Sequence, residues 1–168
     1  MASWTNSDGL TIYYGAAENY QHGEGEYRTN GLLREEELVF NLADLTSTDT
    51  AISRQIFPWG KVLEKVEIIA DQPATGGGTL DVGFVNTKTG AAIAAQGAVA
   101  ALPTASINAE GLDVVLTRGA TNAGTLLGTV VAATKGTNIA ITAKYNTTAF
   151  TGGRVRVKLF WYKKLPTN

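Results

Sequence analysis

The chain has 168 residues, a formal net charge of −1 and no cysteine. This length favours one domain, or one domain with an arm, that buries a core without covalent cross-links. The lack of cysteine excludes disulfides, thiolate metal sites and thiol nucleophiles. The near-neutral charge argues against a nucleic-acid binder.

The sequence gives no sign of membrane insertion or secretion. No stretch approaches the ~20 apolar residues of a membrane helix. The opening MASWTNSDG lacks the basic and apolar regions of a secretory signal. We therefore expect a protein that is made and kept in a cytoplasm, or assembled into a particle there, with no membrane partner.

The N-terminal segment combines aromatic residues with frequent glycines. Residues 1–31 hold four of the six tyrosines, one of the three tryptophans and the only histidine, but no apolar period. One short strand is expected near residues 10–14. We expect residues 1–34 to form an extended arm outside the main core.

The rest of the chain alternates apolar and polar residues, which is typical of half-buried strands. Strands are expected at 35–42, 61–70, 79–85, 112–117, 137–145 and 154–163, with a weaker, glycine-interrupted candidate at 125–133. Turn clusters such as DQPATGGG separate them, and TGGGT is expected to connect a hairpin.

The alanine-rich stretch 91–102 is open to two interpretations. It fits a helix that Gly97 weakens and Pro103 ends, and it fits equally a short strand followed by one helical turn. Trp161 shares the alternation of the last strand and is expected in the core. Trp59, beside Pro58, is expected over one end of the domain.

Short strands with regular turns predict an all-β fold, an antiparallel β-sandwich that is jelly-roll-like, with an N-terminal arm. The sandwich is expected over 35–164 and a short tail over 165–168. The only helical candidate lies in the alanine-rich stretch.

The charges are distributed unevenly. Residues 1–50 carry nine acids and two arginines, whereas residues 51–168 carry six acids and twelve bases. This asymmetry favours contact between an acidic arm and a basic body, within one chain or between two.

A sharper expectation concerns the first and last strands of the sandwich, which are neighbours in jelly rolls. If they pair antiparallel, their polar faces bring opposite charges together, each pair worth about 0.2–1 kcal/mol. Two unrelated solvated faces are the alternative. The residues concerned are Glu35, Glu37, Arg154, Arg156 and Lys158.

The sequence offers little catalytic chemistry. His22 lies in the glycine-rich stretch YQHGEGEY, where a general base has no rigid orienting partner. The spacing of HGEGE does not build a preformed metal site. The glycines of ATGGGTLDV are followed by a strand and no lysine, unlike a phosphate-binding loop. We expect no enzyme, no cofactor and no metal.

A protein without catalytic groups is expected to work by binding. Tyrosine and tryptophan bury large areas at low entropic cost and dominate protein interfaces. The arm is therefore expected to pack against its own sandwich, another copy or another protein. The expected interface residues are Trp4, Tyr13, Tyr14, Tyr20, Tyr27 and Arg28.

Several stretches resemble the capsid decoration, or cement, proteins of tailed bacteriophages. They are SWTNSDGL, GEYRTNG, LADLTST, IFPWGKVLEKVEII, GGGTLDVGFVNTKTGAAI and GRVRVKLFWYKK, which together cover most of the chain. The resemblance implies a protein on the outer capsid surface, commonly a trimer and sometimes a dimer. Its partner would be the major capsid protein, and its task would be to clamp neighbouring capsomers.

Two other readings stay open at the level of sequence. A phage tail, adaptor or fibre protein would have a similar β-rich chain. A carbohydrate-binding β-sandwich module would present an exposed aromatic platform, for which Trp59 is the best candidate.

Overall fold

The computed structural model describes residues 2–5, 11–14, 34–48, 50–51, 61–130 and 139–163. The chain divides into two compact units, Met1–Leu33 and Arg34–Asn168. In the first unit, β1 (Ala2–Thr5) and β2 (Thr11–Tyr14) pair antiparallel as a sheet of their own. Strand β2 coincides with the strand expected near 10–14, whereas β1 was not foreseen.

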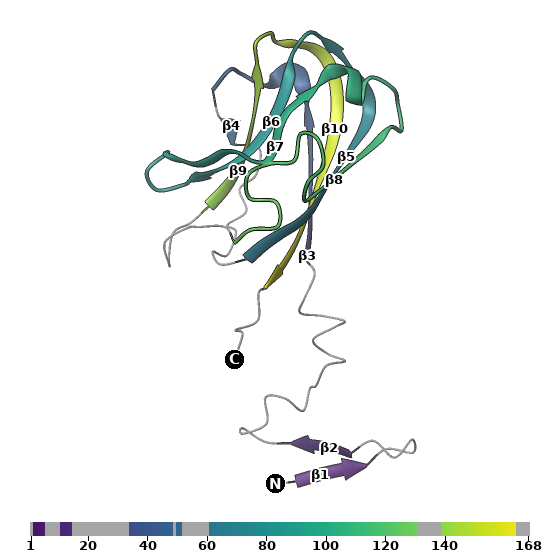
Figure 1. The fold of residues 1–168 in the computed structure, drawn as a ribbon, viewed down its shortest axis with the longest axis vertical. Helices are drawn as coiled ribbons and strands as arrows, with labels where there is room; N and C mark the ends of the chain where they lie inside the picture. The colour runs from purple at the N-terminus through teal and green to yellow at the C-terminus, as the bar shows by residue number, and fades with distance from the viewer. Residues whose placement is uncertain are drawn as a thin grey trace. The chain divides into compact units, whose positions relative to one another are not determined.

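The second unit is an all-β antiparallel sandwich, which confirms the predicted fold class (Figure 1). One four-stranded sheet has the order β3-β10-β5-β8 and the other the order β4-β9-β6-β7. The strands of the first are β3 (Arg34–Asn41), β10 (Phe150–Lys163), β5 (Lys61–Gly76) and β8 (Asp113–Thr117). Those of the second are β4 (Thr50–Ala51), β9 (Ile139–Asn146), β6 (Thr79–Asn86) and β7 (Ala92–Pro103). Short 3-10 turns lie at Leu42–Asp44 and Thr104–Ile107.

The strand pairing is nested along the sequence. Strand β3 pairs with β10, β4 with β9, β5 with β8 and β6 with β7, all antiparallel. The chain therefore behaves as one long antiparallel ribbon that is folded over into two sheets. From this order we infer the jelly-roll-like connectivity that the sequence suggested.

The core lies between the two sheets and is built from the inward residues of each alternation. Val155, Val157 and Leu159 of β10 are fully buried. Trp161 is 2% exposed and meets Phe84 of β6 edge to face, with ring centroids 5.5 Å apart, so its predicted place in the core is confirmed. Such a ring pair links the two sheets directly.

The alanine-rich stretch forms strand β7, so the helical interpretation is wrong and the strand interpretation underestimates its length. Gly97 lets this stretch pack as a strand, because a Cβ there would lie 2.7 Å from Cδ2 of Phe84. Without a side chain at position 97, the Phe84 ring packs directly against the backbone of β7. Tertiary packing thus overrides the helix propensity of alanine.

Three further expectations are corrected. Residues 125–130 form turns and isolated bridges rather than a strand, and 131–138 lie outside the described residues. The TGGGT stretch carries the chain from β5 in one sheet to β6 in the other, so it is not a hairpin. Strand β5 continues to Gly76 through the expected DQP turn.

A buried carboxylate organises the second sheet. Asp81 of β6 is fully buried, and its Oδ1 accepts a hydrogen bond of 2.7 Å from the backbone N–H of Ala101. Its Oδ2 accepts from Nε2 of Gln96 at 2.9 Å and from Nδ2 of Asn146. The side chain therefore joins β6 to β7 and β9, and it supports Ala101 at a positive φ of 49°.

The outer edge of β7 is covered by the loop after β8. Residues 123–126 run beside β7, where Leu126 N–H donates to Gly97 O at 3.0 Å and Gly124 N–H to Ala98 O at 3.2 Å. Nδ2 of Asn122 adds hydrogen bonds to the carbonyls of Ala100 and Ala101. This protects the edge from pairing with another chain.

Candidate protein-binding surface

The outer face of the β3-β10-β5-β8 sheet carries a network of acidic and basic side chains. Strand β10 presents Arg156 and Lys158 there, between β3 and β5. Lys158 lies opposite Glu37 of β3 and opposite Glu67 of β5 in the strand register. Opposite and diagonal neighbours on one face of a sheet are close enough to form ion pairs.

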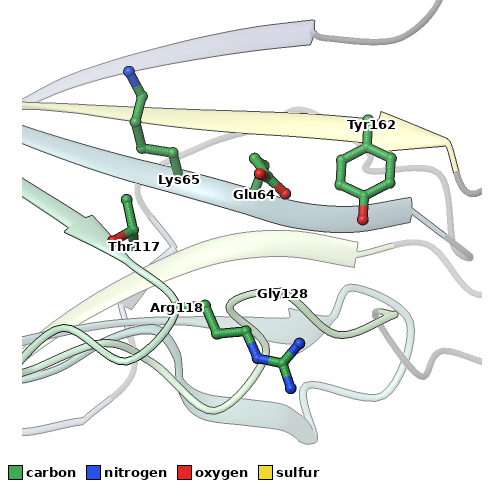
Figure 2. A pocket seen from close by; sticks show the side chains of 6 residues that line it. All are labelled: Glu64, Lys65, Thr117, Arg118, Gly128 and Tyr162. Atoms are coloured by element: carbon green, nitrogen blue, oxygen red, sulfur yellow. The ribbon is translucent and has the colours of Figure 1, made fainter.

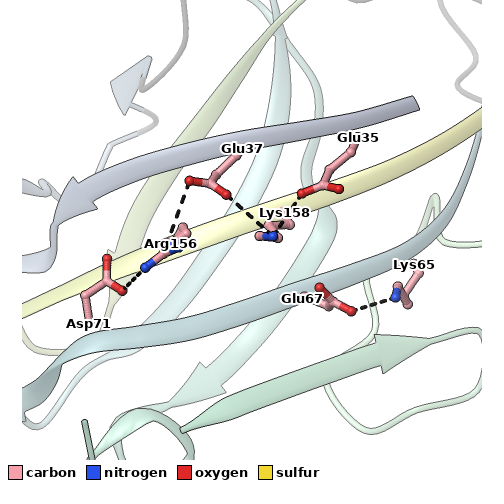
Figure 3. A network of polar contacts seen from close by, with 7 residues as sticks. All are labelled: Glu35, Glu37, Lys65, Glu67, Asp71, Arg156 and Lys158. Carbon is pink, nitrogen blue, oxygen red and sulfur yellow. Dashed lines mark hydrogen bonds and ion pairs between the residues drawn. The ribbon is translucent and has the colours of Figure 1, made fainter. Parts of the chain in front are cut away.

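The ion pairs form a connected chain across three strands (Figure 3). Lys158 Nζ lies 3.0 Å from Glu35 Oε1 and 3.5 Å from Glu37 Oε2. Arg156 Nε lies 3.9 Å from Glu37 Oε1, and its Nη2 lies 2.6 Å from Asp71 Oδ1. One glutamate thus connects both bases, which fixes the face of β10 between its neighbours.

A second pair lies on the same face. Lys65 Nζ lies 2.6 Å from Glu67 Oε1 and 4.2 Å from the ring centroid of Phe160. Phe160 belongs to the outward set of β10, yet it is only 8% exposed. The stem and ammonium of Lys65 cover the ring, so that a large apolar side chain on the outer face is shielded from water.

The ion pairs shift the protonation of the two bases. A hydrogen bond from Arg156 to Asp71 raises the pKa of Arg156, and the charge of Asp71 adds to this. A hydrogen bond to Glu35 raises the pKa of Lys158 against an opposing effect of burial. Both side chains are therefore positively charged at neutral pH.

Glu36 behaves differently because it lies between Glu35 and Glu37 on the opposite face of β3. Partial burial raises its pKa, and the charge of Lys61 counteracts this only in part. Glu36 pairs in register with Leu159, a fully buried core residue. It is thus an acid at the margin of the core.

The structure brings together four of the five residues that were expected to pair across strands: Glu35, Glu37, Arg156 and Lys158. The fifth, Arg154, lies opposite Asn41 and Gln72. Within the described ranges it forms no ion pair with either glutamate. Asp71 was not predicted to join these ion pairs, because the stretch DQPATGGG was expected to form a turn.

The expected interface residues of the N-terminal segment are placed only in part. In the register of the hairpin, Trp4 lies opposite Ile12, Tyr13 opposite Ser3 and Tyr14 opposite Ala2. Tyr20, Tyr27 and Arg28 lie outside the described residues, as do His22 and Trp59.

The two-unit division changes the interpretation of the charge asymmetry. Residues 1–33 carry only four acids and one arginine, because Glu35, Glu36, Glu37, Asp44 and Asp49 belong to the second unit. Two of these acids are paired with bases of β10. Most of the asymmetry is therefore located within the sandwich, and the expected attraction between an acidic arm and a basic body loses most of its basis.

The described part of the chain contains no group of three or more histidine, aspartate or glutamate residues arranged to hold a metal ion. In the same residues, no helix is long and apolar enough to cross a membrane.

Comparison with known proteins gives no family model and no curated protein that matches. Chains of similar structure occur in three phage capsids. In the capsid of Ralstonia phage GP4 the identity is 18% and the TM-score 0.48, over 80% of this chain and 86% of that chain.

The other two chains lie in the cyanophage Pam1 capsid asymmetric unit and in the acidic stable capsid of Helicobacter pylori bacteriophage KHP30. The first has 19% identity and a TM-score of 0.43 over 95% of this chain and 98% of its own. The second has 12% identity and a TM-score of 0.43 over 82% and 90%. Values this low assign neither a family nor a function to the chain.

Proposed function

We propose that the chain is a non-enzymatic structural protein of a phage particle, which binds the outer surface of the assembled capsid and clamps neighbouring capsomers. Its sequence resemblance to capsid decoration proteins suggested this role. The described structure supports a binding role, because the space between the sheets is filled by apolar side chains and three bases of the outer face, Lys65, Arg156 and Lys158, are engaged in ion pairs.

The observation that carries the proposal is the N-terminal hairpin, whose two strands form a sheet of their own. Strands β1 and β2 contain four residues each and form a two-stranded sheet of their own. A two-stranded hairpin is marginally stable at best in water. A hairpin that carries Trp4, Tyr13 and Tyr14 therefore gains stability by packing on a further surface.

We propose the major capsid protein as that surface. A segment that gains its stability on contact binds only where the complementary surface exists. If that surface spans two capsomers, binding stabilises the assembled shell over its separated parts by mass action. Many copies then act together although each contact is weak. The chain would act as a homo-oligomer, with a trimer favoured and a dimer as the second arrangement.

Removal of residues 1–31 tests this role. The truncated chain should keep the β-type circular dichroism of the full chain, because β3 to β10 build the sandwich core. It should fail to co-sediment with capsids stripped of the protein, whereas the full chain binds them. Capsid binding by the truncated chain at full occupancy would contradict the proposal, and loss of the β-signal would show that residues 1–31 belong to the core.

A pair of double variants separates the hairpin from the sheet face. Tyr13→Ala with Tyr14→Ala should weaken capsid binding by at least about tenfold, as expected for aromatic interface residues. Val39→Ala with Val115→Ala is the matched control, since these valines are exposed by 44% and 48% on the sandwich. The reverse result, with weakened binding only in the valine variant, would place the contact on the sheet.

A further inference from the structure

A pocket lies beside the first residues of β5, at the margin of the charged face (Figure 2). Strand β8 ends at Thr117, opposite Lys65, so residues 61–64 of β5 extend beyond it. The loop after β8 runs along this extension, where Leu127 bridges to Leu63 and Val130 to Val62. The space left over has a volume of about 370 Å³, at the lower end of the range for small-molecule sites.

A β-bulge supplies the pocket with two adjacent charged residues. Phe160 of β10 lies opposite Lys65 and Trp161 lies opposite Leu63, so Glu64 is the extra residue of β5. Leu63 remains fully buried, whereas Glu64 and Lys65 both line the pocket. Bulges re-aim side chains in this way and are frequent beside functional sites.

The opposite wall is formed by Arg118, whose side chain lies across Gly128. A Cβ at position 128 would lie 2.9 Å from Cδ of Arg118, and Gly128 has a φ of +75°. Only glycine allows both this close approach of Arg118 and the positive φ without strain. The loop therefore holds the stem of Arg118 in place. Within the described ranges no carboxylate forms an ion pair with its guanidinium.

The pocket offers both donors and an acceptor. Arg118 presents a planar fork of N–H donors that fits a carboxylate. The hydroxyls of Thr117 and Tyr162 donate or accept, and the Glu64 carboxylate only accepts. Lys65 is already engaged by Glu67. A suitable ligand therefore carries a carboxylate for Arg118 together with hydroxyl donors for Glu64.

We propose that this pocket binds a carboxylated saccharide, such as a uronic acid unit of a glycan. The sugar carboxylate pairs with Arg118, and ring hydroxyls donate to Glu64 and contact Thr117 and Tyr162. An acidic side chain of a protein has the carboxylate but no ring hydroxyls, so it would leave the exposed Glu64 carboxylate to water and would make fewer contacts in the pocket. This site is separate from the proposed contact of the hairpin with a capsid and does not depend on it.

The test is a titration of the ¹⁵N-labelled full chain with sodium D-glucuronate, followed by amide chemical shifts. Saturable shifts near Thr117, Arg118 and Gly128 are expected, with a dissociation constant on the order of 1 mM for so small a ligand. Glucose, which lacks the carboxylate, and acetate, which lacks the hydroxyls, should each bind at least about tenfold more weakly.

Variants assign the contacts. Arg118→Gln should weaken glucuronate binding by about tenfold or more, because a charged bidentate pair is lost. Glu64→Gln tests the hydroxyl acceptor and should reduce the preference for glucuronate over acetate. Arg154→Gln is the matched control, because Arg154 is an exposed arginine of β10 that does not line the pocket. All variants should unfold at the wild-type midpoint.

Three results would overturn the proposal. One is the absence of saturable shifts in these amides at the highest soluble glucuronate concentration. Another is glucuronate binding that Arg118→Gln leaves unchanged. The third is acetate binding as tight as glucuronate binding, which would identify the pocket as a receptor for an acidic side chain of a partner protein.

Discussion

Replacement of Asp81 by alanine tests the account of the sandwich most sharply. The fully buried carboxylate accepts hydrogen bonds from Gln96, Ala101 and Asn146. Truncation removes three hydrogen bonds from partly buried donors to a charged acceptor, each worth about 1.5–3 kcal/mol. Water can enter the space and accept hydrogen bonds from some of these donors. We therefore expect the free energy of unfolding to fall by about 4 kcal/mol in total.

Urea unfolding followed by circular dichroism measures this loss. With a slope of about 2 kcal/mol per molar urea, the unfolding midpoint should fall by about 2 M. Asp113→Ala is the matched control, since Asp113 is an exposed acid of β8, and it should change stability by less than about 0.5 kcal/mol. Asp81→Asn should give an intermediate loss, because an amide presents one acceptor where the carboxylate presents two.

Unfolding of Asp81→Ala at the same urea concentration as Asp113→Ala would contradict this role of the Asp81 carboxylate. The carboxylate would then add nothing to the junction of β6, β7 and β9, and the positive φ of Ala101 would need another support.

Three further predictions concern packing and pH. Gly97→Ala should destabilise the fold by about 1–3 kcal/mol in urea unfolding, because the new Cβ overpacks the Phe84 ring; Gly77→Ala, whose Cβ would lie 3.8 Å from its nearest neighbour, should cost clearly less. Burial raises the pKa of Glu36, so its contribution to stability is complete below the unfolded pKa of about 4.3 and is lost as the pH rises through the folded value. Glu36→Gln should therefore unfold at a higher temperature than wild type at neutral pH, and a difference that persisted in full below both pKa values would contradict this. The raised pKa of Lys158 gives stability that is present below its unfolded pKa of about 10.4 and is lost as the pH rises through the folded value; Lys158→Gln should show a smaller alkaline loss of thermal stability than wild type, and equal losses would count against the ion pairs.

The features that could be predicted from the sequence are those fixed by local alternation. In the last strand, a period of two puts Val155 and Trp161 on one face and Arg156 and Lys158 on the other. Once that strand pairs with the first strand of the sandwich, the signs of the charges determine which residues attract. That the bases of β10 meet the glutamates of β3 follows from these two conditions, whereas the contact of Lys158 with both Glu35 and Glu37 depends also on the strand register.

Other features depend on contacts that are distant in sequence. The sequence of β7 is compatible with a helix or a strand, and the packing of Phe84 against Gly97 favours the strand. Asp71 lies beside a proline that suggests a turn, but pairing with β10 keeps β5 extended through it. The pocket could not be foreseen, because the bulge at Glu64 exists only in the register between β5 and β10.

The net charge of the first 50 residues is misleading because this range includes residues of both units. It suggested that an acidic arm attracts a basic body, yet five of its nine acids belong to the sandwich. Two of the glutamates already have basic partners on β10. The proposed role of the N-terminal unit therefore depends on its aromatic hairpin and not on its charge.

Electron cryomicroscopy of particles that carry this chain would show whether the protein lies on the capsid surface. The proposal predicts density for the sandwich on the outer capsid surface, with the residues of β1 and β2 in contact with the major capsid protein. It also predicts on the order of hundreds of copies per particle, as many weak contacts acting together require. Density confined to a tail or vertex, with a copy number of about six or twelve, would contradict the proposal and identify a tail or adaptor protein.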